Sequence, residues 1–144
     1  MTQATKTYEE GNIFAKMLKG EVPCHKVYED DKTLAFMDIM PQAKGHVLVI
    51  PKQQAVELSD LEPEYASAVF MTAKKVLQAQ RQVFERDGII QMQLNGSEAG
   101  QTVFHYHVHL IPSNIHELGK HAVTMADQDE LAEQAKQLAA IINA

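Results

Sequence analysis

Three histidines occupy alternate positions in the segment His105-Tyr106-His107-Val108-His109. Side chains on a β-strand alternate between its two faces, so a strand from Val103 to Ile111 would carry all three histidines on one face. Imidazole titrates near neutral pH, and a row of such rings suits acid–base chemistry, nucleophilic chemistry or metal binding. The intervening residues would then face a hydrophobic core: Phe104, Tyr106, Val108 and Leu110.

Two kinds of site fit this spacing. Neutral imidazoles on one face, such as the pair His105 and His107, can bind a zinc ion. The outer two of three same-face residues are about 13 Å apart along the backbone, so a metal would need further ligands from elsewhere in the chain. In the other kind of site, a neutral ring attacks phosphorus and a neighbouring charged ring protonates the leaving group. The spacing alone leaves both open.

The elements that position the histidines are predicted from capping residues and apolar periodicity. Asn12 caps a short helix that runs to about Lys19, and Asp127 or Asp129 caps a last helix. A long helix starts at Pro63 and ends at Asp87-Gly88. The strands are predicted at Lys26–Glu29, Thr33–Ile39, Gly45–Pro51, Ile89–Leu94 and Val103–Ile111, with a polar loop at Asn95–Thr102. Short connections favour an α+β fold with an antiparallel sheet of about five strands, one long helix and two shorter ones.

Composition limits the class of protein. The 144 residues suit a single domain over residues 1–144, with residues 1–10 as a loose tail and residues 113–144 as a C-terminal extension that carries a helix. A net charge of −6 without a cluster of basic residues argues against a nucleic-acid partner. No apolar run is long enough to span a membrane. A single cysteine, Cys24, favours the reducing cytoplasm, and no catalytic role is expected for it.

The histidine segment and the residues before it resemble a known signature. Gly100-Gln101-Thr102-Val103-Phe104 followed by the three alternating histidines is similar to the motif of the histidine triad (HIT) superfamily, which comprises nucleotide hydrolases and transferases. Further blocks match in the same order along the chain: Asn12-Ile13-Phe14, Tyr28-Glu29-Asp30-Asp31, Leu34 to Ile39, Gly45 to Pro51, and Asn95-Gly96. The resemblance implies a HIT-like fold and an enzyme acting on nucleotides.

The resemblance assigns a role to each of four histidines. His107 matches the nucleophile that attacks the α-phosphorus and forms a nucleotidyl-histidine intermediate, which water then hydrolyses. His109 matches the histidine that orients the site together with an upstream partner, and that partner matches His46. His105 matches a member that supports the geometry of the strand.

Other matched positions would bind the substrate, a purine nucleotide derivative. Gln101 and Thr102 match donors to phosphate oxygens beside the bond that breaks, and Asn95 matches a further phosphate contact. Asp38 matches the carboxylate that accepts hydrogen bonds from the ribose hydroxyls. An apolar slot for the base would be formed by Phe14, Val22, Phe36 and Ile39.

Three departures from the family pattern matter. Many bacterial relatives hold a structural zinc with a Cys-x-x-Cys pair and a histidine, but this chain has Asn12, Ala15 and Gln54 at those positions. No metal and no cofactor are therefore expected. Ser113 stands where many relatives have an arginine, so a cation that could steady the leaving group is missing.

Because relatives pair through their sheets, the resemblance also implies a homodimer. Two other classes of protein remain: a nucleotide-binding regulator or scaffold with little turnover, and a metalloprotein that uses His105 and His107.

Three histidines lie outside the matched set and are expected on the surface: His25, His116 and His121.

Overall fold

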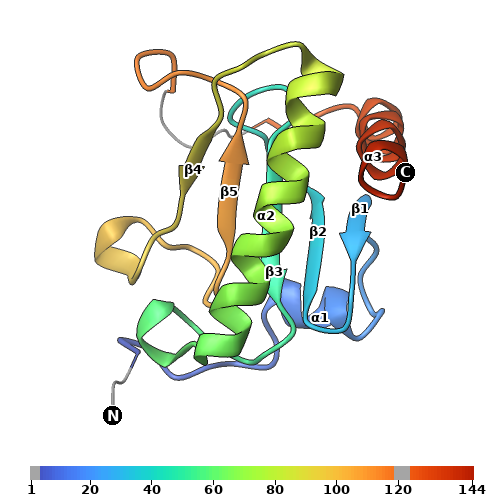
Figure 1. The fold of residues 1–144 in the computed structure, drawn as a ribbon. Helices are drawn as coiled ribbons and strands as arrows, with labels where there is room; N and C mark the ends of the chain where they lie inside the picture. Colours follow the sequence, from blue (N-terminus) through green and yellow to red (C-terminus); the bar gives the residue numbers. More distant parts are fainter. Residues whose placement is uncertain (1–3, 119–123) are drawn as a thin grey trace.

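The chain forms one antiparallel sheet with helices on both faces, as the computed structural model shows for residues 4–118 and 124–144 (Figure 1). The strands are β1 (Lys26–Glu29), β2 (Thr33–Met37), β3 (Val47–Pro51), β4 (Ile90–Met92) and β5 (Val108–Ile111), in the spatial order β1-β2-β3-β5-β4. The α-helices of the described residues are α1 (Ile13–Leu18), α2 (Pro63–Phe84) and α3 (Gln128–Ile142). Short 3₁₀ turns occur at Leu58–Asp60 (η1) and Ser97–Ala99 (η2). The predicted α+β fold is confirmed.

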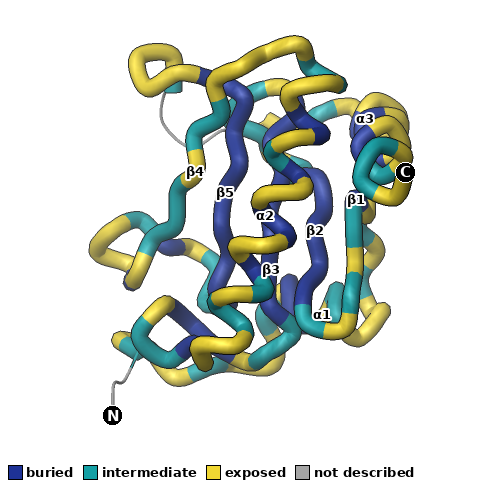
Figure 2. Tube along the Cα trace, viewed as in Figure 1, coloured by how far each residue is buried: buried dark blue, intermediate teal, exposed yellow. Residues whose placement is uncertain are grey.

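The period-two alternation of the central strands creates two separate cores. Ala35, Val49 and Leu110 face α2 and α3, which cover one side of the sheet. Phe36 and Leu48 face the opposite side, where they pack against Phe14 of α1. Because both faces are covered, β2, β3 and β5 are buried along their length, whereas the edge strands β1 and β4 are more exposed (Figure 2).

Local capping chemistry sets the helix ends. The side chain of Asn12 accepts a hydrogen bond from the Ala15 N–H at 2.9 Å, as predicted for the start of α1. Asp127, rather than Asp129, caps α3. The helix α2 ends at Phe84, earlier than predicted, because Glu85 adopts a left-handed conformation with φ of 51°. Within the described residues, no helix has the length and apolar character that a membrane crossing requires.

The prediction of a regular strand from Val103 to Ile111 is wrong in its first half. The β3–β5 ladder pairs Val49 with Val108 and does not extend to the earlier residues. The N–H of Tyr106 donates instead to the carbonyl of Ala55 at 2.8 Å, so the chain bends before it joins the sheet. Only His109 of the three histidines lies within a strand.

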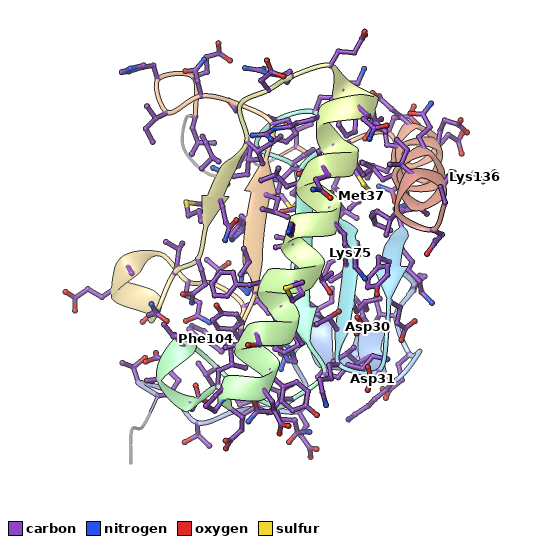
Figure 3. The ribbon with its side chains drawn as sticks, viewed as in Figure 1. Asp30, Asp31, Met37, Lys75, Phe104 and Lys136 are labelled. Atoms are coloured by element: carbon purple, nitrogen blue, oxygen red, sulfur yellow. The ribbon has the colours of Figure 1, made fainter. Side chains whose placement is uncertain are left out.

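The expected alternation of side chains nevertheless largely persists. Tyr106, Val108 and Leu110 belong to the core under α2. Phe104 does not, and this expectation is also wrong. Its ring is half-buried on the segment ahead of β5 (Figure 3), with the ammonium of Lys6 at 5.0 Å from the ring centroid.

The prediction of a loose N-terminal tail is likewise wrong for residues 5–10, whereas residues 1–3 lie outside the described part. The hydroxyl of Thr5 donates to the carboxylate of Glu57 at 3.0 Å. Tyr8 reaches the ring of His105, which is described below. The segment is therefore attached to the loop after β3 and to the residues before β5.

Candidate active site

A pocket of about 420 Å³ opens on the α1 side of the sheet. Its apolar wall comes from α1 and the central strands, and includes Phe14, Phe36 and Leu48. His107 and His109 line the same pocket, and His109 is the cross-strand neighbour of Leu48. The loop after β2 and the loop before β5 complete the rim. Two histidines therefore share one cavity with a hydrophobic wall that comes from distant parts of the chain, the usual make-up of a small-molecule site.

Hydrogen bonding determines which nitrogen of His107 carries the proton. Nδ1 lies 2.7 Å from the backbone carbonyl oxygen of His105, and a carbonyl can only accept. Nδ1 is therefore protonated, and in the neutral ring the lone pair is on Nε2. Burial lowers the pKa of His107 below its ordinary value of 6.5, which keeps the ring neutral at pH 7. The ring of Phe14 meets His107 edge-on, at 5.0 Å between centroids.

A second chain of hydrogen bonds determines the proton on His109. The N–H of Gln42 donates to Nδ1 of His46 at 3.1 Å, so the proton of His46 is on Nε2. That Nε2–H donates to Nδ1 of His109 at 3.0 Å, which leaves the proton of His109 on its own Nε2. Burial, helped by the nearby His109 and His107, lowers the pKa of His46 to about 3. His46 is thus a neutral, buried donor that orients His109.

His105 is fixed from both sides. Its Nε2 donates to the carbonyl of Pro51 at 2.8 Å, and its Nδ1 lies 2.7 Å from the hydroxyl of Tyr8. Burial lowers the pKa of His105 to about 4. The ring does not line the pocket, whereas its backbone carbonyl holds the ring of His107.

The geometry disfavours a metal at either candidate set. Ligand atoms of Asp38, His46 and His109 lie within 4.8 Å of one another. A metal on Nε2 of His46 would require the ring proton on Nδ1, but Nδ1 already accepts from the N–H of Gln42. For the pair His105 and His107, both nitrogens of His105 and one of His107 are engaged in hydrogen bonds.

Gln101 and Thr102 differ in how they meet the pocket. Gln101 is buried, and its amide accepts from the Gly96 N–H at 2.8 Å while it donates to the carbonyls of Val56 and Val103 at 2.7 and 3.0 Å. A donation from this amide to phosphate would require one of these bonds to break. Thr102 is exposed at the pocket rim, where its hydroxyl can reach a ligand.

The predicted nucleotide-binding residues are only partly brought together. Phe14, Phe36, Ile39 and Asp38 line the pocket. One carboxylate oxygen of Asp38 lies 3.5 Å from Nε2 of His46, and the other accepts from the N–H of Met40 at 2.8 Å.

Val22 and Asn95 do not line this pocket. The side-chain oxygen of Asn95 accepts instead from the N–H of Leu58 at 2.9 Å. The predicted base contact of Val22 and phosphate contact of Asn95 stay predictions.

Sequence reasoning missed several residues that the fold adds to the site. Ile13 and Met17 line the pocket, and their four-residue spacing on the predicted first helix was a usable signal. Met40 and the backbone N–H of Gln42 come from an irregular loop, for which no periodicity exists. Of the histidines expected on the surface, His116 is exposed and His25 is half-buried against Gln128, while His121 lies outside the described residues.

Comparison with known proteins identifies the family of this chain. The model of the HIT domain family matches residues 19–116, and the chain therefore belongs to the HIT family. It is 45% identical over 103 residues to Protein hit of Bacillus subtilis, which covers 72% of this chain and 71% of the relative. It is 40% identical over 107 residues to the adenosine 5'-monophosphoramidase hnt1 of Schizosaccharomyces pombe, covering 74% and 77% of the two chains. The fold matches the crystal structure of a Hit-like protein from Bartonella henselae with a TM-score of 0.86 and 41% identity, over 94% of this chain and 99% of the other.

Proposed function

We propose that this protein hydrolyses purine nucleoside phosphate derivatives at the α-phosphate, of the nucleoside phosphoramidate or dinucleoside polyphosphate type, through a covalent nucleotidyl-His107 intermediate. The observation that carries the proposal is the 2.7 Å hydrogen bond from Nδ1–H of His107 to the His105 carbonyl. It leaves a lone pair on Nε2 of a neutral ring that lines the pocket, which is the requirement for a nucleophile at pH 7.

In the first step, Nε2 of His107 attacks the α-phosphorus while the bond from phosphorus to the leaving group breaks. The leaving group departs with the electron pair of that bond and takes a proton from solvent. The phosphorylated ring of His107 becomes positively charged, and the carbonyl of His105 stabilises that charge through Nδ1–H. The Nε2–H of His109 is positioned by His46 to donate to the departing atom or to a phosphate oxygen.

In the second step, water attacks the same phosphorus and the bond to Nε2 breaks. The electron pair returns to His107, which regains the neutral form, and the proton of the water passes to solvent. The products are a nucleoside monophosphate and the enzyme in its starting state. Both steps use the same nitrogen, so a single fixed tautomer of His107 serves the whole cycle.

The pocket supports recognition of a nucleotide. Phe14, Phe36 and Ile39 offer an apolar surface for a purine base, and Asp38 offers carboxylate oxygens for the ribose hydroxyls. Thr102 would donate to the phosphate, whereas Gln101 would act mainly by bracing the loop before β5.

The expected homodimer is part of the same proposal. The strand β4 lies at one end of the sheet order, so its outer edge can pair with β4 of a second copy and continue the sheet. Size-exclusion chromatography with light scattering would measure the mass of the assembly and so test the homodimer.

We propose the cytoplasm as the compartment, on the basis of the single half-buried cysteine.

Turnover tests the proposed function directly. The protein is incubated with adenosine 5'-phosphoramidate and with a diadenosine polyphosphate, and nucleotide products are quantified for wild type, His107→Ala and the surface control His116→Ala. We expect wild type and the control to turn over at least one substrate, and His107→Ala to be slower by about 10³-fold or more. Mass spectrometry after a denaturing quench should detect a nucleotidyl adduct in wild type and in His116→Ala, and none in His107→Ala. Tight nucleotide binding without turnover would instead establish a binding protein.

A further inference from the structure

The hydroxyl of Tyr8 is bonded to the catalytic segment from the far end of the chain. It lies 2.7 Å from Nδ1 of His105, across 97 positions of sequence. The rings of the two residues also meet edge-on, with 5.5 Å between centroids and an interplanar angle of 63°. Tyr8 is half-buried and does not line the pocket, so direct contact with substrate does not account for it.

The direction of this hydrogen bond follows from the hydrogen bond at Nε2, the other ring nitrogen of His105. Nε2 of His105 donates to the carbonyl of Pro51, so the proton of the neutral ring is on Nε2. Nδ1 then carries a lone pair, and Tyr8 must be the donor. A buried acceptor that loses its donor is costly unless water replaces it. The carbonyl of Pro51 selects the tautomer of His105, and Tyr8 satisfies the remaining nitrogen and helps to hold the ring in one orientation.

We propose that Tyr8 is a positioning residue for the nucleophile, acting through His105 on His107. His105 connects the two, because its ring accepts from Tyr8 while its backbone carbonyl accepts from Nδ1–H of His107 at 2.7 Å. If the ring of His105 is released, its backbone gains freedom, and the carbonyl no longer selects a single tautomer of His107. This inference rests on the proposed function, in which the lone pair on Nε2 of His107 attacks phosphorus.

Contacts on both sides of Tyr8 hold it in place. Thr5 donates from its hydroxyl to Glu57 at 3.0 Å, and Glu10 accepts from the amide of Gln54 at 3.0 Å. Lys6 lies over the ring of Phe104, one residue before His105. The N-terminal segment thus spans the loop after β3, which follows Pro51 directly, and the residues before β5, which include His105.

The substitution Tyr8→Phe isolates the hydroxyl, because the ring and its edge-on contact with His105 are retained. A matched control is Tyr28→Phe. The hydroxyl of Tyr28 donates to Asp30 at 3.0 Å and accepts from Lys75 at 3.0 Å, on the α2 side of the sheet and away from the pocket (Figure 3). Both variants lose one hydrogen-bonded phenol hydroxyl, and only one of them loses the link to His105.

Two readouts decide the inference. The first is the tautomer of His107 from long-range ¹H–¹⁵N correlation spectra, with the signals assigned by comparison with His107→Ala. The second is the separation of kcat from KM with the nucleoside phosphoramidate. For Tyr8→Phe we expect a mixture of His107 tautomers, kcat lower by about tenfold and KM within about threefold. For Tyr28→Phe we expect the tautomer and kcat of wild type.

The tautomer decides whether the inference stands. If His107 in Tyr8→Phe keeps its single Nδ1–H tautomer, the inference is overturned. A fall in thermal stability with an unchanged tautomer would likewise overturn it, because the role of Tyr8 would then be structural. If wild type itself turns over neither substrate, the proposed function fails. The spectra still decide the role of Tyr8 in that case, because they require no turnover.

Discussion

Acidification from pH 7 to pH 5 should destabilise this protein through two buried histidines. His46 and His105 are 1% and 0% exposed, and their pKa values in the folded protein are about 3 and about 4, against 6.5 for the free side chain. Below pH 6.5 the unfolded chain binds a proton at each ring, whereas the folded protein does not. The stability that these neutral rings contribute is therefore complete above pH 6.5 and is lost as the pH falls toward 4 and 3.

The magnitude follows from proton linkage. Integration of the difference in bound protons between pH 7 and pH 5 gives roughly 2 kcal/mol for each ring, and roughly 4 kcal/mol for the pair. The pKa of His107 is also lowered by burial, so this ring adds to the loss in the same direction. Solvent screening does not reduce this, because both rings are buried. Carboxylates with lowered pKa values, such as Glu29 and Glu57, start from 4.5 in the unfolded chain and change protonation mainly below pH 5. The chosen pH window thus isolates the histidines.

Urea unfolding at pH 7 and pH 5, at one fixed protein concentration, measures this loss. A loss of roughly 4 kcal/mol is large against a typical total of about 5–15 kcal/mol. In the variant His46→Asn the loss should be smaller than in wild type by roughly 2 kcal/mol, whereas His116→Ala, which changes an exposed ring, should show the wild-type loss. The reasoning is refuted if the wild-type free energy of unfolding differs by less than about 1 kcal/mol between the two pH values.

Two further predictions concern the loops that frame the site. Gln101→Leu removes three hydrogen bonds to the backbone, two of them buried, and should cost about 2–4 kcal/mol in urea unfolding, whereas the exposed Thr102→Ala should cost less than about 0.5 kcal/mol. Similar costs for the two variants would contradict the bracing role. Gly45→Ala places a Cβ at 2.6 Å from the ring of Phe84, at a φ of +88°, and should lower stability by about 1–3 kcal/mol. An unchanged thermal midpoint would show that the loop before β3 relaxes freely.

The first half of the triad segment shows why a correct pattern produced a wrong element. Alternation correctly separated the core residues Tyr106 and Val108 from the histidines. It could not show that the N–H of Tyr106 bonds to Ala55, because that partner lies in a loop with no periodicity of its own. A period of two in the sequence indicates which face each side chain points to, but it does not show that the backbone forms a strand. A bent segment next to a strand can have the same period.

The N-terminal segment was misread for a related reason. Residues 1–10 are polar and carry no apolar periodicity, which is typical of a solvated tail. The contacts that hold Thr5 and Tyr8 are single hydrogen bonds to Glu57 and His105, and each depends on a partner far away in the chain. The composition of a segment does not indicate single hydrogen bonds to distant partners, so these contacts could not be predicted from it.

Local sequence determined the caps of the first and last helices, the order of the elements and the two faces of the central strands. These follow from short-range rules, since a cap acts over three residues and alternation over two. Tertiary structure alone decided which nitrogen of each imidazole carries its proton. That choice depends on Gln42 for His46, on His46 for His109, and on Tyr8 with Pro51 for His105. A neutral imidazole side chain has two tautomers of similar free energy, and the donors and acceptors that folding places around it decide which one is populated.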